Sequence, residues 1–278
     1  MASNRPQVPA WLTAFPPTEM PELSDHDTAC LVLADLDYEA QLVAIHGLLD
    51  RHRKAEAALG EEIKEIEAIA QRTSGLRNEV AVSEWIDRLH SSVYQDAAHS
   101  MSAVGMLAPF VESLFYHAFR GIQRHLTGNS SSLNAHGRWL QPAEDQWDCH
   151  FVWTNGRRST NLVQGINQLS DAVGLLPHLP TNLFQMLDAL FAYRNKMFHC
   201  GFEWTPEERL RFQKRLDSSG WPQDWFAKAT AGGEPWIFYL TDTFVRHCLE
   251  RIEQAIAGIG AFCKVVLMPA HPKTRGTP

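Results

Sequence analysis

The chain has 278 residues, of which 45% are hydrophobic and 21% are charged, a composition typical of a globular protein that excludes disorder over most of its length. The net charge of −7 argues against a protein that coats nucleic acid with a broad basic surface, because phosphate binding depends on clustered Lys and Arg. Any contact with RNA must therefore be local.

The first part of the chain predicts a proline-rich lead and then a helical arm. Residues 1–23 hold five prolines and indicate an extended or disordered segment. Residues 24–75 predict one long helix or a helical pair, capped at its start by Ser24 and Asp25. Gly47 and Gly60 are candidate breaks. The narrow apolar stripe on this charged rod fits either a helix packed on its own domain or a partner-binding arm.

Residues 80–267 are expected to form a helical domain, and 268–278 a flexible tail. A core helix is predicted up to Leu126, with Pro109 marking a kink or a start because proline removes a backbone donor. The Asn155-Gly156 pair predicts a turn in a small irregular or hairpin insert, which leads into a short helix.

The second half of this domain carries clear helix boundaries. A helix is predicted from Leu183, with Asn182 in its start signal, and Gly201 is suited to end it. Thr205 is expected to cap the next helix, whose first residue is a proline. A last long helix is predicted over 242–266. The expected fold class is therefore all-α.

Neither a membrane span nor a signal peptide is expected, since charged or polar residues interrupt the longest apolar stretches. The five cysteines form no Cys-x-x-Cys pair, which predicts neither a disulfide framework nor a structural zinc site. A cytoplasmic location is the simplest interpretation. The adjacent pairs Cys149-His150, His199-Cys200 and His247-Cys248 have spacing unlike that of most metal sites.

A local basic patch is one route to an RNA contact, and a solvated surface is the alternative. Five arginines in the middle of the chain are the candidates, namely Arg120, Arg124, Arg138, Arg157 and Arg158. Three tryptophans in the same region could stack on bases, although irregular spacing favours local packing. They are Trp139, Trp147 and Trp153.

The strongest chemical signal is Arg194. On a helical wheel it falls within the apolar stripe formed by Leu183, Leu187, Leu190 and Phe191, so a permanent charge stands where a leucine is expected. Such a placement costs free energy unless another group neutralises the charge. One explanation is a buried ion pair with Glu112, in which case His199 only caps the end of the helix.

The other explanation is a catalytic site completed by symmetry. Asn195 and His199 share one flank of the helix, whereas Arg194 and His199 diverge by roughly 140 degrees. A two-fold axis along this face would bring arginine and histidine from two copies together. The helix dipole favours a protonated imidazole at position 199, which could then exchange a proton near neutral pH.

These side chains suit RNA cleavage by attack of the ribose 2′-hydroxyl on the adjacent phosphate. His199 would act as general acid or base, Arg194 would stabilise the charge that accumulates on the phosphoryl group, and Asn195 would orient the other groups. Such chemistry requires neither a metal nor a cofactor. The sequence contains no Walker or Rossmann glycine-rich loop and no Gly-x-Ser-x-Gly motif.

The segment 194–199 resembles the signature of the HEPN superfamily, an arginine, a polar residue and then a histidine late in a core helix. The helix around Glu112 is similar to the family's preceding core helix, which often bears an acidic residue, and we expect Glu112 to support the site. The resemblance covers about residues 80–266. It does not extend to the subgroup with a tyrosine two positions after the histidine, because Gly201 occupies that place.

The resemblance implies a homodimeric helical bundle that cleaves RNA without a metal, in a toxin–antitoxin, phage-defence or RNA-processing role. An antitoxin or regulatory protein is then a further expected partner, and no membrane is involved. Some relatives are not catalytic, so the alternative is a helical dimer that binds a nucleotide or a protein.

Overall fold

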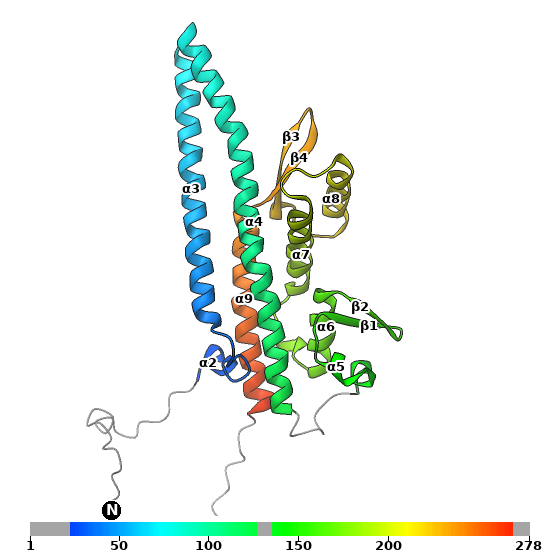
Figure 1. Cartoon of the computed structure of the whole chain (residues 1–278). Coiled ribbons are helices and arrows are strands. Elements are labelled where there is room, and N and C mark those ends of the chain that lie inside the picture. The colour runs from blue at the N-terminus through cyan, green and yellow to red at the C-terminus, as the bar shows by residue number, and fades with distance from the viewer. Residues whose placement is uncertain (1–22, 127–134, 269–278) are drawn as a thin grey trace, which may run out of the picture.

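The computed structural model describes residues 23–126 and 135–268 (Figure 1). This part of the chain is mostly helical, in agreement with the expected class, and it also contains two small antiparallel β-hairpins. The predicted lead and tail lie outside the described residues, apart from Leu23 and Met268. Among the helices of the described part, none combines the length and the apolar character needed to cross a bilayer.

The N-terminal region forms a short helix, α2 (Asp25–Ala29), followed by the long helix α3 (Tyr38–Arg72). The predicted start of α2 is confirmed, because the side chains of Ser24 and Asp27 and their backbone N–H groups form a reciprocal capping box. Gly47 and Gly60 do not interrupt α3.

Helix α3 is one arm of a long antiparallel hairpin whose other arm is α4 (Leu76–Leu126) (Figure 1). Gly75 lies in the connection with φ of 62°, a conformation that glycine adopts without strain. Helix α4 continues through Pro109, so the interpretation of this proline as a helix start is wrong.

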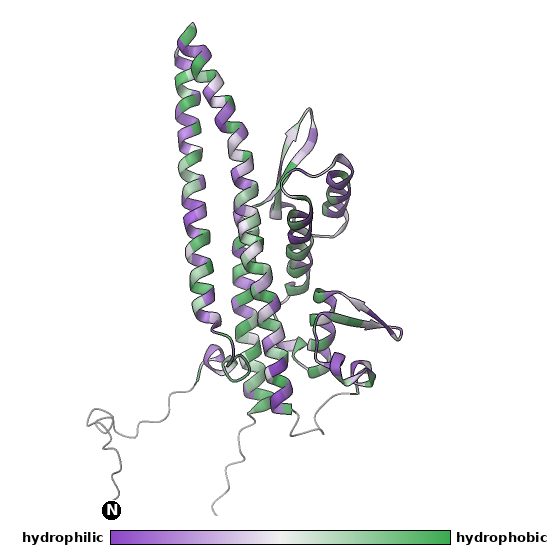
Figure 2. Ribbon diagram, in the orientation of Figure 1, coloured by the Kyte–Doolittle hydropathy of each residue, from purple (hydrophilic) through white to green (hydrophobic). Residues whose placement is uncertain are grey.

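The core lies where α4 meets the last long helix, α9 (Asp242–Phe262), which continues as a π-helical turn at Cys263–Leu267. Hydrophobic residues are frequent on both helices there, whereas the free end of the α3–α4 hairpin is mixed (Figure 2). Helix α2 crosses α9 at Gly260, where an added Cβ would lie 1.6 Å from the carbonyl oxygen of Asp25. Glycine is therefore required at this crossing.

The insert between α4 and the second half of the domain contains the expected hairpin. Its strands β1 (Phe151–Thr154) and β2 (Arg157–Thr160) are joined by Asn155 and Gly156, which both have positive φ. The other elements of the insert are η1 (Gly137–Leu140), α5 (Ala143–Gln146), α6 (Leu162–Val173) and η2 (Leu176–His178).

The second half begins with α7 (Leu183–Cys200) and α8 (Pro206–Ser218). Thr205 caps α8 as predicted, but the side chain of Asn182 makes no capping hydrogen bond to α7. A short turn, η3 (Gln223–Trp225), leads to a second hairpin formed by β3 (Phe226–Ala231) and β4 (Glu234–Leu240), which the sequence analysis did not predict.

This second hairpin fixes the position of α7. The buried hydroxyl of Tyr193 donates a hydrogen bond to the carbonyl oxygen of Phe238 on β4, at 2.8 Å. The ring of Tyr193 also contacts the rings of Trp204 and Phe212. An aromatic cluster thus packs along one side of α7, whereas the last three residues of the helix, 198–200, are exposed.

Candidate active site at the end of helix α7

Arg194 lies at the edge of the buried face of α7. Eight residues of this helix are buried, namely Leu183, Met186, Leu187, Ala189, Leu190, Ala192, Tyr193 and Met197. Because α7 packs against α4, α6 and α9, its buried face is wide. The centre of this face does not coincide with the centre of the apolar stripe that the sequence analysis used to place Arg194. The expectation that Arg194 is embedded in apolar surroundings is therefore wrong, and its side chain is half-buried.

The guanidinium of Arg194 contacts two residues of its own helix. Its Nη1 atom donates a hydrogen bond to Oδ1 of Asn195 at 3.1 Å, and its Cζ atom lies 5.3 Å from the ring centroid of Phe198. Within residues 23–126 and 135–268, no carboxylate lies within ion-pair distance of this guanidinium. Asn195 thus orients the positive charge, which has no acidic partner among the described residues.

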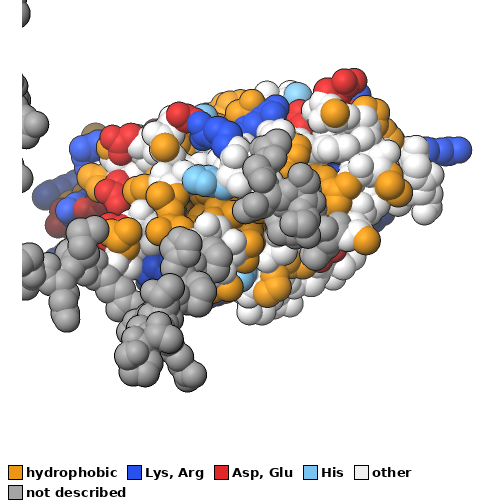
Figure 3. Space-filling view, turned by 90° about the horizontal axis from the view of Figure 1, so that it is seen from below, with side chains coloured by type: hydrophobic (Ala, Val, Ile, Leu, Met, Phe, Trp, Pro, Cys, Tyr) orange, Lys and Arg blue, Asp and Glu red, His pale blue; other side chains and the backbone are white. Residues whose placement is uncertain are grey.

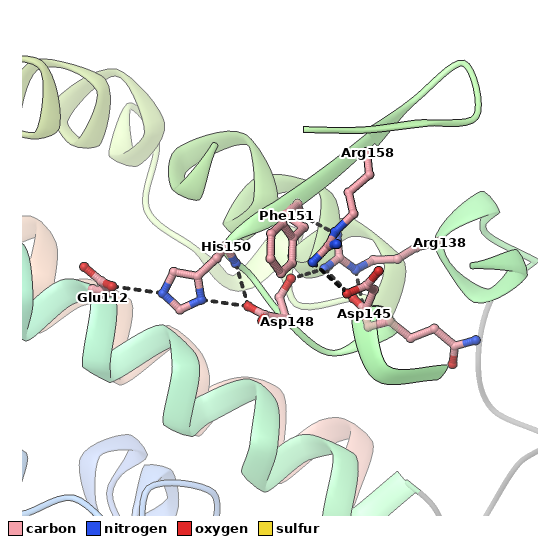
Figure 4. A network of polar contacts seen from close by, with 8 residues as sticks. Glu112, Arg138, Asp145, Asp148, His150, Phe151 and Arg158 are labelled. Carbon is pink, nitrogen blue, oxygen red and sulfur yellow. Dashed lines mark hydrogen bonds and ion pairs between the residues drawn. The ribbon is translucent and has the colours of Figure 1, made fainter. Parts of the chain in front are cut away.

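Glu112 does not pair with Arg194, which corrects the hypothesis of a buried ion pair between them. Its Oε1 atom instead lies 2.9 Å from Nε2 of His150, at the start of β1 (Figure 4). Glu112 therefore links α4 to the insert and makes no direct contact with the guanidinium.

Asn195 and His199 are both exposed on the last two turns of α7. The helix ends at Gly201, whose φ of 69° and ψ of −150° suit glycine and whose N–H donates to the carbonyl oxygen of Met197. The structure thus brings Arg194 and Asn195 together. In the described residues it shows no contact between Arg194 and His199 of the same chain.

Phe198 is a further member of the site that the sequence analysis did not identify. Its side chain is 50% exposed, and its ring lies over Gly105 of α4, where an added Cβ would be 3.5 Å from the ring. Phe184, Phe191 and Phe198 recur every seven residues, and this spacing was the available signal for an aromatic flank beside Arg194. We refer to Arg194, Asn195, Phe198 and His199 as the α7 site.

A second polar cluster surrounds His150, whose two ring nitrogens contact Glu112 at 2.9 Å and Asp148 at 2.7 Å (Figure 4). Burial alone lowers the pKa of His150, but the hydrogen bonds and charges of both carboxylates outweigh it, so the net pKa is raised. Burial acts in the opposite direction on Asp148 and raises its pKa, but the hydrogen bonds from His150 outweigh this effect, so the net pKa is lowered. This arrangement favours a protonated imidazole between two carboxylates.

The five arginines in the middle of the chain do not form one basic patch. Arg138 is 1% exposed and donates hydrogen bonds to the carbonyl oxygens of Gln146 and Phe151. Arg124 pairs with Asp35, and Arg158 pairs with Asp145. On the end of the molecule shown in Figure 3, basic side chains likewise lie among acidic and apolar ones. The electrostatics of this region therefore support no broad RNA-binding surface.

The group Asp148, Cys149 and His150 holds potential metal ligands within 4.8 Å of one another. However, both ring nitrogens of His150 are engaged by carboxylates. Burial raises the pKa of the Cys149 thiol to about 12, which disfavours the thiolate that a metal requires. The group is better described as a structural link than as a metal centre.

The α7 site combines a charged guanidinium, an amide, an aromatic ring and an imidazole at an exposed helix end. Such groups can hold a phosphate, stack on a base and transfer a proton. No protein-family model, no curated protein and no solved structure matches the chain, so the interpretation of this site rests on its own residues.

Proposed function

We propose that this protein is a homodimeric endoribonuclease of the HEPN type, and that the α7 site cleaves RNA without a metal. The observation that supports this proposal most directly is the guanidinium of Arg194, which Asn195 orients at the exposed end of α7 and which no carboxylate of the described residues neutralises. His199 lies on the last turn of the same helix and is open to solvent.

The reaction uses the 2′-hydroxyl of the RNA itself as the nucleophile. The 2′-oxygen forms a bond to phosphorus while the bond from phosphorus to the 5′-oxygen breaks, which gives a 2′,3′-cyclic phosphate and a 5′-hydroxyl. His199 accepts the proton of the 2′-hydroxyl or donates one to the leaving oxygen, and Arg194 stabilises the negative charge on the phosphoryl oxygens. Asn195 keeps the guanidinium in place.

A second copy of the chain completes the site in this proposal. Arg194 and His199 diverge by roughly 140 degrees on one helix, so a single chain does not direct both toward one phosphate. A two-fold axis beside Phe198 would bring Arg194 of one copy near His199 of the other and would cover the exposed ring. The exposed ring of Phe198 and the lack of contact between the guanidinium of Arg194 and the imidazole of His199 in the described chain both support this arrangement.

An enzyme of this type needs control, because cleavage of cellular RNA is harmful. The proposal therefore includes a toxin–antitoxin, phage-defence or RNA-processing role and a regulatory protein that covers the α7 site.

The test is cleavage of total cellular RNA and of a defined oligoribonucleotide by the purified protein in excess chelator. We expect products with cyclic phosphate and 5′-hydroxyl ends. His199→Ala and Arg194→Ala should each lower the rate by about 100-fold or more, the usual contribution of an acid–base group or of a charge-stabilising donor. A mixture of the two variants should recover part of the activity if each active site uses residues from both copies.

Cys200→Ser is the matched control, because Cys200 is exposed and adjacent to His199 but has no part in the proposed chemistry. Sedimentation must show that all variants keep the same oligomeric state. If the wild type cleaves no RNA as a dimer, or if His199→Ala cleaves as fast as Cys200→Ser, the enzyme proposal is wrong. In that case a non-catalytic dimer that binds a nucleotide or a protein becomes the better description.

A further inference from the structure

Helix α3 has a long face that the rest of the described chain leaves exposed. The side of the helix that packs on α4 is marked by His52, whose ring stacks on that of His99 (Figure 1). On the same side, the carbonyl oxygen of Ala70 accepts a hydrogen bond from Asn78. On a wheel of about 100 degrees per residue, six exposed residues are turned away from α4 and lie within a sector of about 60 degrees. This outer face of α3 consists of Gly47, Arg51, Lys54, Ala58, Glu65 and Ile69.

The charge of the outer face changes sign at its middle. The basic residues Arg51 and Lys54 precede Ala58, whereas Glu65 follows it, with Glu62 at the border of the face. Arg51 and Glu65 form no ion pair within the described part of the chain. They are separated by about 21 Å along one helix, at a rise of about 1.5 Å per residue, so they cannot neutralise each other within one copy.

A second copy of α3, packed antiparallel with a two-fold axis at Ala58, would bring these charges together. Arg51 is seven residues before Ala58 and Glu65 is seven residues after it, so each arginine would lie opposite the glutamate of the other copy. Lys54 and Glu62 are related in the same way, four residues on either side, although each is also paired within its own chain. A parallel pair in register would instead place like charges opposite one another, which is unfavourable. The charge pattern is therefore complementary to itself in the antiparallel arrangement.

Gly47 supports the same arrangement independently of the charges. Glycine is less favourable than alanine inside a helix, yet an added Cβ at position 47 would meet no atom of the described chain within 4 Å. The packing of a single copy therefore does not explain this glycine. Gly47 is eleven residues before Ala58 and Ile69 is eleven residues after it, so Ile69 of a second copy would lie over Gly47. This contact would cover the side chain of Ile69, which is 43% exposed, beside the still more exposed Val43.

We propose that the outer face of α3 is a self-association surface, at which two copies of the chain pair antiparallel about Ala58. The surface is separate from the α7 site, so the proposal does not depend on ribonuclease activity. Many of its contacts are exposed ion pairs, each of which changes an affinity by at most about fivefold and is screened by salt. The association is therefore weak and depends on ionic strength.

The test is sedimentation of the full chain carrying Phe198→Asp, a change that removes the dimer proposed for the α7 site. We expect this parent protein to form dimers at low ionic strength that dissociate as salt is added. Arg51→Glu and Glu65→Arg each place like charges opposite one another in both symmetric pairs, and each should weaken the association by about tenfold or more. A mixture of these two variants restores opposite charges in both pairs, as does the double variant R51E/E65R. Both should therefore associate as the parent does.

Lys214→Glu is the matched control for the change in net charge. Lys214 is an exposed residue of α8 that forms no ion pair among the described residues, so its reversal should leave the association unchanged. Circular dichroism confirms that each variant is folded, and the wild-type chain serves as the parent if Phe198→Asp is not.

A disulfide cross-link tests the position of the two-fold axis. In a chain with the exposed cysteines removed as C30S/C200S, Ala58→Cys should form a cross-linked dimer under mild oxidation. Ala57→Cys should not, because Ala57 is equally exposed but is turned by about 100 degrees from the outer face. A parent that stays monomeric at low salt, a mixture of Arg51→Glu and Glu65→Arg that stays dissociated, or equal cross-linking at positions 57 and 58 would each overturn the proposal.

Discussion

The contact between His150 and its two carboxylates gives a stability prediction with a defined pH dependence. The substitution His150→Gln removes the charge between Glu112 and Asp148. Each hydrogen bond between charged groups contributes about 1.5–3 kcal/mol. The side chain of His150 is 33% exposed and that of Glu112 is 39% exposed, so solvent screening reduces the total to about 2 kcal/mol. For a chain of this size, that loss lowers the melting temperature by about 4–8 °C.

The sign of the pH dependence follows from the direction of the pKa shifts. Since the pKa of His150 is raised, its contribution is complete below the unfolded value of about 6.5 and is lost as pH rises through the folded value. The pKa of Asp148 is lowered, so its contribution is present above the unfolded value of about 3.9 and is lost at lower pH. The difference between wild type and variant should therefore be largest between about pH 4 and 6.5 and small at pH 9.

Urea unfolding at pH 6 and pH 9 measures this difference, with His117→Gln as the control. His117 lies on the same helix as Glu112, and among the described residues no carboxylate is within ion-pair distance of it. The difference in the free energy of unfolding between the control and the wild type should be the same at both pH values. A His150→Gln variant as stable as the wild type at pH 6, or equally destabilised at both pH values, would refute the reasoning.

Three further substitutions test the packing and the assembly. Phe198→Asp should weaken the proposed dimer by about tenfold or more in sedimentation, because a charge replaces an apolar contact, and an unchanged dimer would place the interface elsewhere. Gly121→Ala should lower the free energy of unfolding in urea by about 1–3 kcal/mol, since its Cβ would lie 2.1 Å from the carbonyl oxygen of Val32. An unchanged free energy of unfolding would contradict the close contact between Gly121 and Val32. Arg138→Met should lower the free energy of unfolding by about 3 kcal/mol or more, because it leaves buried carbonyl oxygens without donors. A melting temperature equal to that of the wild type would contradict this explanation.

Local signals in the sequence were sufficient for most helix boundaries. The hydroxyls of Ser24 and Thr205 accept hydrogen bonds from backbone N–H groups three residues later, so four consecutive residues are sufficient to identify each cap. The Asn155-Gly156 turn is also local, because both residues adopt positive φ. These predictions needed no knowledge of the tertiary structure.

The hairpin of β3 and β4 shows where local patterns were insufficient. Its turn carries Gly232 and Gly233, both with positive φ, which was the available sequence signal. However, the strand 234–240 does not alternate strictly, since Ile237 and Phe238 are both buried. The strand packs against α4 and α8, and Tyr193 of α7 donates a hydrogen bond to the carbonyl oxygen of Phe238. Its burial pattern therefore follows from the tertiary packing and not from a local alternation.

The half-buried position of Arg194 also follows from tertiary packing, and it changes the reasoning about the α7 site. The helical wheel assumes one apolar stripe, but a helix packed against three others is buried over more than half of its circumference, and the centre of the stripe cannot be located from four residues. A fully buried guanidinium would have made dimerisation a requirement for folding, because an unneutralised charge in the core is costly. A half-buried guanidinium that contacts Asn195 and Phe198 carries no such cost. In the proposed function, a second copy would then be needed only to bring an imidazole to the phosphate, and assembly would be a step at which activity is controlled.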